Sequence, residues 1–280
     1  MGIFTDQMGR DVEIKSPPQR IISLVPSQTE LLCDLGLSDE VIGITKFCVH
    51  PDQWFQSKKR IGGTKQLNIE LIKSLQPDLI IANKEENLKE EVEELAKYFP
   101  VWISDINNLD DAIEMIQSIG EITDKKSKAE EIVNKIRTHF NELKNAPSSK
   151  ALLQEKYPHQ PVCYIIWRDP YMTVGGDTFI NDMLQRCGFE NIFKNKQRYP
   201  EFTISDLPQM NCQLILLSSE PYPFKQEHVH ELQELFPETM ILLADGQMFS
   251  WYGSRLVKAP AYFEQLQIQV LSLAHAAGHR

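Results

Sequence analysis

The chain alternates short apolar runs with amphipathic helical patterns, in two blocks separated by a long helical stretch. Apolar runs of the first block lie at residues 21–25, 41–45, 79–82 and 101–103. Those of the second block lie at residues 162–167, 214–218 and 240–244. Because strands that alternate with helices form parallel sheets covered on both faces, the pattern predicts two α/β units.

The stretch between the blocks has a different character. Residues 109–146 contain no proline and no strand-like run, and their apolar side chains recur every three or four positions. A helix over residues 124–145 would be about 33 Å long at 1.5 Å per residue, long enough to bridge two lobes. We therefore expect an N-terminal α/β lobe over 1–108, a helical segment over 109–146 and a C-terminal α/β lobe over 147–280.

Local signals predict several element boundaries. Ser27 and Glu30 have the spacing of a capping box, and Asp177 precedes the apolar positions of a helix over 177–186. Residues 46–67 lack a clear period and read as a long loop. The last helix is expected over residues 254–277.

Charge and hydropathy exclude several classes of protein. The chain has 29 Lys and Arg against 39 Asp and Glu, giving a formal net charge of −10. With no basic stretch, it is a poor candidate for binding nucleic acid. No window approaches 18 consecutive apolar residues, so no membrane-spanning segment is predicted.

The N-terminus and the cysteines point to a compartment. The first ten residues have no basic region followed by an apolar core, so no export signal is visible. Five scattered cysteines without a C-x-x-C pair read as reduced thiols, which fits a reducing compartment. If Met1 is the native start, these features predict a cytoplasmic protein.

Large aromatic residues gather where the predicted strands end. Ligands of parallel sheets bind beyond the carboxyl ends of the strands, and aromatic walls suit a large, flat or partly apolar ligand. The alternative is that some of these rings only pack the lobes. The rings are Phe47, Trp54, Phe55, Trp167, Tyr171, Tyr222, Phe224, Phe249, Trp251 and Tyr252.

Two arginines and two histidine clusters could add polar contacts. Arg168 and Arg255 lie in the same loops and are candidates for an acidic group of a ligand; the alternative is an ion pair with a nearby carboxylate. The clusters Cys48-Val49-His50 and His228-Val229-His230 lack the third and fourth ligands of a zinc site, so surface or packing histidines are expected. His50 is also a hypothetical axial contact to a metal carried by the ligand.

No recognisable catalytic motif is present, and no catalytic residue is expected. Glu70 and Glu220 are considered as surface carboxylates. Glu70 lies near the start of a helix, where the macrodipole alone accounts for an acid. Glu220 precedes Pro221-Tyr222-Pro223-Phe224, a rigid aromatic segment of the kind found at recognition surfaces.

Several segments of the chain resemble those of a known family. The chain is similar to the iron-chelate and cobalamin substrate-binding proteins of ABC-type importers with a helical backbone, nearest the cobalamin-binding branch. The matching segments are residues 5–10, 20–30, 41–45, 67–72, 76–82 and 187–193.

The resemblance implies two Rossmann-like lobes with parallel sheets, one long interdomain helix and a ligand cleft between the lobes. It implies no enzyme activity and no resident cofactor, and an ABC permease dimer as partner for a monomeric binding protein. Glu70 and Glu220 would then dock onto the permease. The ligand, a cobalamin-like corrinoid or an iron chelate, would contact Phe47, His50, Trp167, Arg168, Tyr171, Trp251, Tyr252 and Arg255.

A second hypothesis is a cytoplasmic protein or enzyme that handles corrinoids or metal chelates on the same scaffold. The missing export signal motivates it, because members of the resembled family are extracytoplasmic. Its catalytic residues would be sought among Cys48, His50, Arg168 and Asp245, although their spacing matches no known triad or metal site.

Overall fold

A computed structural model describes residues 1–145 and 160–277 and divides the chain into two compact units. Unit 1 comprises Met1–Ile106, Asp110–Lys135 and Trp251–Arg255. Unit 2 comprises Asn107–Leu109, Ile136–Ser250 and Leu256–Arg280. The lobe boundary predicted at residues 146–147 lies outside the described residues.

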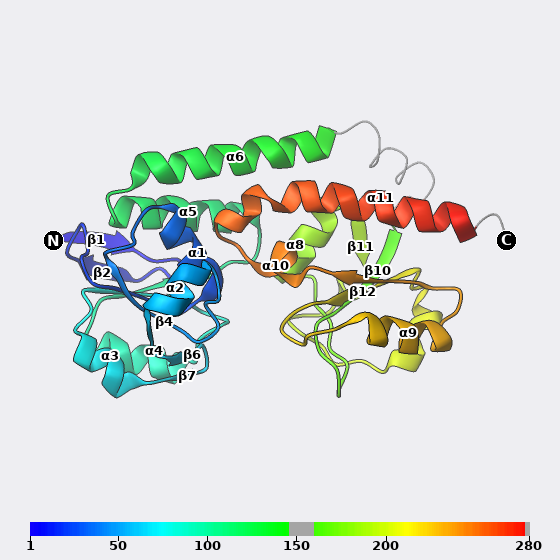
Figure 1. The fold of residues 1–280 in the computed structure, drawn as a ribbon, viewed down its shortest axis with the longest axis horizontal. Helices are drawn as coiled ribbons and strands as arrows, with labels where there is room; N and C mark the ends of the chain where they lie inside the picture. The colour runs from blue at the N-terminus through cyan, green and yellow to red at the C-terminus, as the bar shows by residue number, and fades with distance from the viewer. Residues whose placement is uncertain (146–159, 278–280) are drawn as a thin grey trace. The chain divides into compact units, whose positions relative to one another are not determined.

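Unit 1 is built on a five-stranded parallel sheet (Figure 1). Its strand order is β5 (Lys59–Arg60), β4 (Val41–Ile44), β3 (Ile21–Ser23), β8 (Leu79–Asn83) and β9 (Val101–Ser104). The chain runs outward from β3 to β4 and β5, then returns to the other side of β3 for β8 and β9. This reversal beside the first strand is where open α/β sheets bind ligands.

The helices of unit 1 were predicted, except the one at Asp52–Ser57, which forms where a loop was expected. They are α1 (Pro26–Asp34), α2 (Asp52–Ser57), α3 (Ile69–Leu75), α4 (Lys89–Ala96) and α5 (Leu109–Ile122). All five residues of β8 are buried, as expected for a central parallel strand covered on both faces.

Unit 2 has a four-stranded parallel sheet. Its order is β11 (Phe189–Asn191), β10 (Gln160–Ile165), β12 (Leu214–Ser218) and β13 (Met240–Ala244). The helical elements around it are α8 (Phe179–Arg186), η1 (Ile204–Met210), α9 (Gln226–Leu235), α10 (Gly246–Ser250), η2 (Ser254–Val257) and α11 (Ala259–Ala277). The two parallel sheets confirm the predicted fold class.

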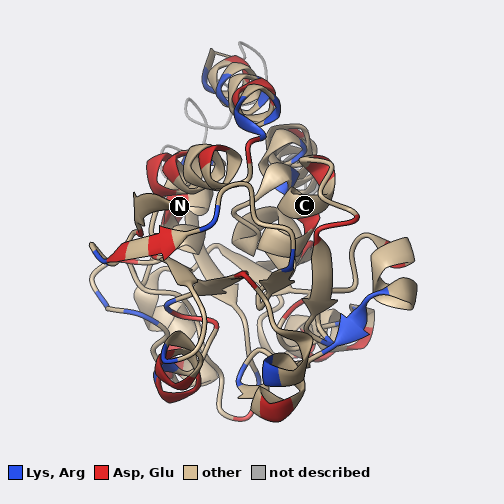
Figure 2. Cartoon of the chain, turned by 90° about the vertical axis from the view of Figure 1, so that its left-hand side faces the viewer, with Lys and Arg blue, Asp and Glu red and all other residues tan. Residues whose placement is uncertain are grey.

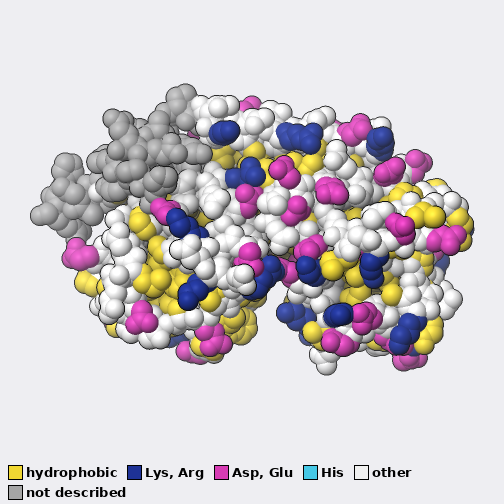
Figure 3. Space-filling view, turned by 180° about the vertical axis from the view of Figure 1, so that it is seen from behind, with side chains coloured by type: hydrophobic (Ala, Val, Ile, Leu, Met, Phe, Trp, Pro, Cys, Tyr) yellow, Lys and Arg dark blue, Asp and Glu magenta, His cyan; other side chains and the backbone are white. Residues whose placement is uncertain are grey.

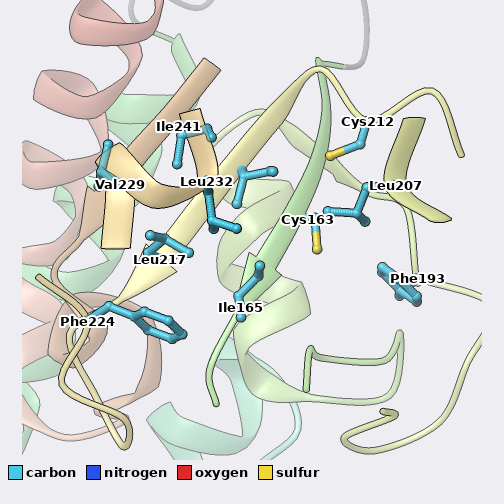
Figure 4. Close-up of a cluster of buried hydrophobic side chains, with 11 residues drawn as sticks. Cys163, Ile165, Phe193, Leu207, Cys212, Leu217, Phe224, Val229, Leu232 and Ile241 are labelled. Carbon is cyan, nitrogen blue, oxygen red and sulfur yellow. The ribbon is translucent and has the colours of Figure 1, made fainter. Parts of the chain in front are cut away.

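A cluster of buried apolar side chains covers one face of the second sheet (Figure 4). Ile215 and Leu217 of β12 pack in one cluster with Val229 and Leu232 of α9. Leu207 of η1 joins the same cluster. Side chains two apart on a strand share a face, so β12 presents this apolar pair to its covering helix.

The predicted interdomain helix is α6 (Lys126–Asn145), a single 20-residue helix. Its first half belongs to unit 1 and its second half to unit 2. In unit 2, Phe140 meets Phe263 of α11, with ring centroids 6.4 Å apart.

Several predicted boundaries were wrong. Residues 46–67 are not one loop, because α2 and three short strands form there, namely β5, β6 (Gly62–Gly63) and β7 (Gln66–Leu67). A hairpin of β1 (Gly2–Thr5) and β2 (Asp11–Ile14) was not anticipated. These strands have two to four residues, too few for an alternation to stand out.

Two predicted helix caps were also wrong. Helix α1 starts at Pro26 without a side-chain cap, because proline is preorganised for the first helical position and its missing N–H needs no partner. Helix α8 is capped by Thr178, whose hydroxyl accepts the Asn181 N–H, while Asp177 accepts the Arg198 N–H instead. The last helix begins at Ala259 because residues 254–257 form the separate 3₁₀ turn η2.

The two units share a local repeat that the residues alone did not reveal. The residue that follows α3, Gln76, and the residue that follows η1, Asn211, are both in the left-handed conformation, with φ of 46° and 54°. A buried strand begins three residues later in each case, at Leu79 and at Leu214. The two segments therefore correspond position by position, which makes Ser205 the equivalent of Glu70.

Charges of both signs are interspersed on the surface. Figure 2 shows acidic and basic residues together on helices and loops, and Figure 3 shows them mixed with apolar side chains on one face. Many are paired one helical turn apart, as in Lys135–Glu131 at 2.7 Å. Among the described residues, no helix is both long and apolar enough to cross a membrane.

Candidate functional site

The predicted ligand contacts fall into two groups, one in each unit. Unit 1 carries Phe47 and His50 after β4, together with the segment Trp251–Arg255, here called the 251–255 segment. Unit 2 carries Trp167, Arg168 and Tyr171 after β10. The loop with Phe47 and His50 follows β4 and the loop with Trp167, Arg168 and Tyr171 follows β10, each at the carboxyl end of a parallel strand, whereas the 251–255 segment follows helix α10.

Arg255 is held by a carboxylate within unit 1. Its Nε and Nη2 donate to the two oxygens of Glu30 on α1, both at 2.8 Å. Only 10% of the Arg255 side chain and 13% of the Glu30 side chain are exposed. Arg255 therefore forms the internal ion pair that was considered as the alternative to ligand contact. Its two parallel hydrogen bonds to one carboxylate make this a strong type of ion pair.

The same guanidinium covers an indole. The central carbon of Arg255 lies 4.5 Å from the ring centroid of Trp251, a cation–π geometry. Trp251 in turn meets His50, with ring centroids 5.6 Å apart and planes at 67°. Glu30, Arg255, Trp251 and His50 thus form a continuous series of contacts that ends at a partly exposed imidazole.

Tyr252 is fixed by a second carboxylate. Its hydroxyl donates to Oε1 of Glu86 at 2.5 Å. Glu86 lies in the loop after β8, where buried Asn83 accepts the N–H groups of Glu85 and Glu86. This side-chain-to-backbone bonding fixes the loop much as a turn would, and it fixes where Glu86 presents its carboxylate.

Gly253 allows the segment to approach α1. A Cβ at residue 253 would lie 2.5 Å from the carbonyl oxygen of Ser27 and 3.3 Å from Cβ of Leu31. Because any side chain would collide with helix backbone, only glycine allows this close approach. The contact explains how the 251–255 segment becomes part of unit 1.

Phe47 is the exposed ring of the unit 1 group. Half of its surface is accessible, at 51%. The ammonium of Lys46 lies 5.1 Å from its centroid, and both side chains pass over Gly63. A ring supported from one side and open on the other can stack on a flat ligand.

The unit 2 group is held by aromatic packing. Trp167 is 40% exposed and meets Tyr222 edge-on, with centroids 5.7 Å apart. Tyr222 also contacts Phe224 at 4.6 Å and His228 at 5.6 Å. These contacts fix Trp167 while leaving much of its surface accessible.

Arg168 and Tyr171 extend this group. Arg168 forms an ion pair with Glu231 of α9 at 2.8 Å. This arginine therefore also has an internal carboxylate partner, the alternative to ligand contact that the sequence left open. Its side chain is more exposed than that of Arg255, at 27%. Burial raises the pKa of Tyr171, whose ring contacts Phe202 at 6.0 Å, so the phenol stays protonated at neutral pH.

Several predicted rings and histidines serve packing. Trp54, Phe224 and Phe249 are buried at 2%, 5% and 0% exposure. His228 is buried and its Nδ1 accepts the Lys225 N–H at the start of α9, whereas His230 is exposed. Among the described residues, no three potential metal ligands gather in one place.

The two predicted docking carboxylates have different settings. The Glu70 side chain is 86% exposed, with Lys73 at 3.4 Å. Glu220 is half-buried, and its Oε1 accepts a hydrogen bond from Ser250 at 2.7 Å. A Cβ on Gly246 would lie 2.6 Å from Cγ of Glu220, so this side chain is confined.

The residues proposed for an enzyme have structural partners. Burial raises the pKa of the Cys48 thiol, which contacts the hydroxyls of Thr29 and Thr45 at 3.1 Å. A buried, neutral thiol lacks the thiolate and the access that a nucleophile needs. Asp245 accepts the N–H of Gln247 through its side chain, as in a local turn.

Sequence reasoning missed the residues that hold these groups. Glu30 and Glu86 received no ligand-site role, and neither did Asn83. Glu30 is a charged residue on a helix whose neighbours Thr29 and Leu31 are both buried, a setting that only the structure reveals. Its partner is 225 residues away, which no local pattern reveals.

Comparison with known proteins places the chain in a family. The model of a family described as periplasmic binding protein matches residues 21–235, most of the chain. The chain belongs to the periplasmic binding protein family. The sheet of unit 1 and the strands β10, β11 and β12 of unit 2 fall within this match, whereas β13 and the 251–255 segment lie beyond its end.

Individual relatives agree with this assignment. A vitamin B12-binding protein of Vibrio parahaemolyticus is 27% identical over 76% of this chain and 72% of its own. An uncharacterised ABC transporter substrate-binding lipoprotein of Bacillus subtilis is 27% identical over 75% of this chain and 67% of its own. The crystal structure of a periplasmic heme-binding protein from Pseudomonas aeruginosa superposes with a TM-score of 0.77 at 19% identity, covering 88% of this chain and 91% of the other, which shows a shared fold.

Proposed function

We propose that this protein is the substrate-binding component of an ABC-type importer and captures a metal chelate, either a cobalamin-like corrinoid or an iron chelate. Membership of the periplasmic binding protein family supports the role in transport. The observation that carries the ligand class is the pair of exposed rings, Phe47 and Trp167, each at the carboxyl end of a parallel strand. Flat, partly apolar macrocycles are the ligands that such rings stack on.

His50 gives the proposed site a metal-binding group. Its imidazole is partly exposed and is fixed on one side by Trp251. A neutral imidazole nitrogen is a common ligand of iron and other transition metals. His50 would therefore fill one axial position of a metal that the ligand brings with it.

The arginines enter this proposal indirectly. Arg168 and Arg255 each pair with a carboxylate of their own unit, Glu231 and Glu30. Their guanidinium charge is largely neutralised before any ligand arrives. Recognition then rests on ring stacking and on His50, which is consistent with a ligand whose binding face is mostly apolar.

The direct test is an equilibrium titration of the purified protein with hydroxocobalamin and, separately, with hemin. Both chromophores absorb where indoles emit, so binding should quench the emission of the four tryptophans. Trp167→Ala should weaken binding by about tenfold, the effect of losing roughly 1.4 kcal/mol of stacking. Tyr98→Ala, which removes a ring that is 56% exposed beyond α4, is the matched control and should leave affinity unchanged. Absence of quenching by both chromophores would refute the ligand assignment.

The partner of the proposed transport function is an ABC permease. Glu70 stands out from the start of α3 and is open to solvent, so it is available for an arginine of a partner. In unit 2 the hydrogen bond to Ser250 restrains Glu220. The local repeat offers a second carboxylate for that unit, Asp206, which is exposed and adjoins the equivalent of Glu70.

A transport assay with the permease in proteoliposomes would separate these carboxylates. Glu70→Lys should abolish ligand-stimulated ATP hydrolysis while leaving ligand affinity intact. Comparing Glu220→Lys with Asp206→Lys decides which acid of unit 2 takes part. Reduced ligand affinity in Glu70→Lys would instead place Glu70 in the ligand site and contradict its docking role.

Such a partner would place the protein outside the cytoplasmic membrane, as the name of the family implies. Fractionating cells that express the natural gene would test this. Recovery of the protein with the cytosol would favour the alternative of an intracellular chelate-handling protein.

A further inference from the structure

We propose that Glu30 and Arg255 are positioning residues that hold Trp251 and, through it, the His50 imidazole in the orientation needed to bind a ligand-borne metal. The part of this inference that concerns ligand binding rests on the proposed function. It assigns to Arg255 a role different from the direct ligand contact expected from sequence. It also gives a role to Glu30, which has no place among the predicted site residues.

Arg255 has no freedom to follow a ligand. Both of its forked hydrogen bonds go to Glu30 at 2.8 Å, and nine-tenths of its side chain is buried. A planar guanidinium fixed at two donors has one orientation. Glu30 in turn lies on α1, the helix that directly follows strand β3 of the unit 1 sheet.

The fixed guanidinium of Arg255 supports the indole of Trp251. The guanidinium lies 4.5 Å from the ring centroid, and Trp251 is only 6% exposed. The neighbouring residues are fixed too, Tyr252 by Glu86 and Gly253 by its close approach to Ser27. Trp251 therefore presents a rigid surface on unit 1 despite coming from a distant part of the chain.

The indole of Trp251 in turn contacts the imidazole of His50. Its ring meets the indole edge-on, with ring centroids 5.6 Å apart. Of the four residues in this series, His50 is the one in the loop that also carries exposed Phe47. An axial ligand acts only if its nitrogen points at the metal, and residues behind a ligating imidazole commonly set that direction. Here an aromatic ring backed by an ion pair would do so.

The test uses the full chain and begins without ligand. Glu30→Gln keeps the shape of residue 30 but removes its charge, so Arg255 loses its anchor. We expect the tryptophan emission of the folded variant to shift, and we expect that shift to vanish when the same substitution is made in a Trp251→Phe background. The control is Arg186→Gln, which breaks the comparable pair with Asp182 at 2.8 Å beside Phe140. It should leave the Trp251 contribution unchanged.

The second arm measures affinity for hemin and hydroxocobalamin on variants shown by circular dichroism to be folded. Glu30→Gln should weaken the binding of the chelate that the wild type prefers by about tenfold. In a His50→Ala background the same substitution should cost almost nothing further, because both changes act on one contact. Exchanging the charges, Glu30→Arg with Arg255→Glu, should recover part of the affinity.

Either arm can overturn the inference. An unchanged emission in folded Glu30→Gln, or losses of affinity that simply add in the double variant with His50→Ala, would mean that the pair only stabilises the fold. If the wild type bound neither chelate, the proposed function would fail, while the emission measurements would still decide whether Glu30 positions Trp251.

Discussion

The two candidate ligand groups are built in different ways. In unit 1, carboxylates hold the group, with Glu30 on Arg255 and Glu86 on Tyr252. In unit 2, aromatic rings hold it, with Trp167 against Tyr222, and the Arg168–Glu231 pair lies nearer the solvent. The same kind of sequence signal, an arginine close to aromatic residues in a predicted loop, has produced two different environments.

Burial accounts for the difference. The side chains of Arg255 and Glu30 are 10% and 13% exposed, whereas those of Arg168 and Glu231 are 27% and 53% exposed. Water screens the second pair and competes for its hydrogen bonds. In the first pair each charge depends on the other, because neither can be solvated if its partner is removed. Unit 1 therefore offers a rigid surface and unit 2 an adjustable one.

The largest expected effect separates these two ion pairs. Arg255→Gln should lower the free energy of unfolding by about 3 kcal/mol, because it leaves the Glu30 carboxylate buried without a cation. Arg168→Gln should lower it by less than about 1 kcal/mol, since Glu231 remains solvated. Urea denaturation of both variants measures this, and equal losses would remove the distinction between the units.

A smaller effect tests how the 251–255 segment joins unit 1. Gly253→Ala should lower the free energy of unfolding by about 2 kcal/mol, because the new methyl meets the Ser27 carbonyl and the segment must shift. Gly63→Ala is the matched control, since its methyl would meet only the flexible end of Lys46 at 3.2 Å and the ring of Phe47. Its cost should stay below about 1 kcal/mol. A neutral Gly253→Ala would show that the segment is not held as described.

Alkaline pH should weaken unit 2 through its buried thiols and phenols. Burial raises the pKa of Cys212 to about 11 and that of Tyr262 to about 12. In the unfolded chain these groups ionise at lower pH, so the unfolded state loses protons first. Stability is therefore full below about pH 8.5 and falls as the pH rises toward the folded values.

Urea midpoints between pH 8 and 11 would test this, compared with Cys212→Ala. The loss assigned to Cys212 is about 2 kcal/mol by pH 11, and the variant should show a correspondingly shallower fall. Identical pH profiles for the two proteins would contradict the burial of this thiol.

The smallest effect concerns Glu70. Its side chain is almost fully exposed and its contact with Lys73 is long, at 3.4 Å. Glu70→Gln should change the free energy of unfolding by less than about 0.5 kcal/mol. Thermal denaturation measures this, and a larger loss would mean that Glu70 has a structural role that complicates its use as a docking variant.

Periodic features of the sequence predicted the fold well. The alternation of apolar runs with helices indicated both parallel sheets, and the proline-free stretch indicated α6. Short elements such as β6 and β7 escaped because two residues carry no period. Helix starts were misplaced where a proline took the first helical position, as at Pro26, or where a neighbouring hydroxyl took the capping position, as at Thr178.

The candidate site was less predictable. The sequence could place aromatic residues and arginines in the loops after predicted strands, because the positions of the strands along the chain follow from local patterns. It could not say which rings are open, as Phe47 and Trp167 are, and which are buried, as Phe249 is. That distinction depends on contacts across hundreds of residues, such as Glu30 with Arg255.

The ligand proposed for this binding protein is a metal chelate. Native mass spectrometry of the protein incubated with an equimolar mixture of hydroxocobalamin and hemin tests this most directly. We predict a one-to-one complex with at least one of the two, and loss of that complex when Trp167 and His50 are both replaced by alanine. A spectrum with only unliganded protein, or a complex unaffected by the double replacement, would contradict it.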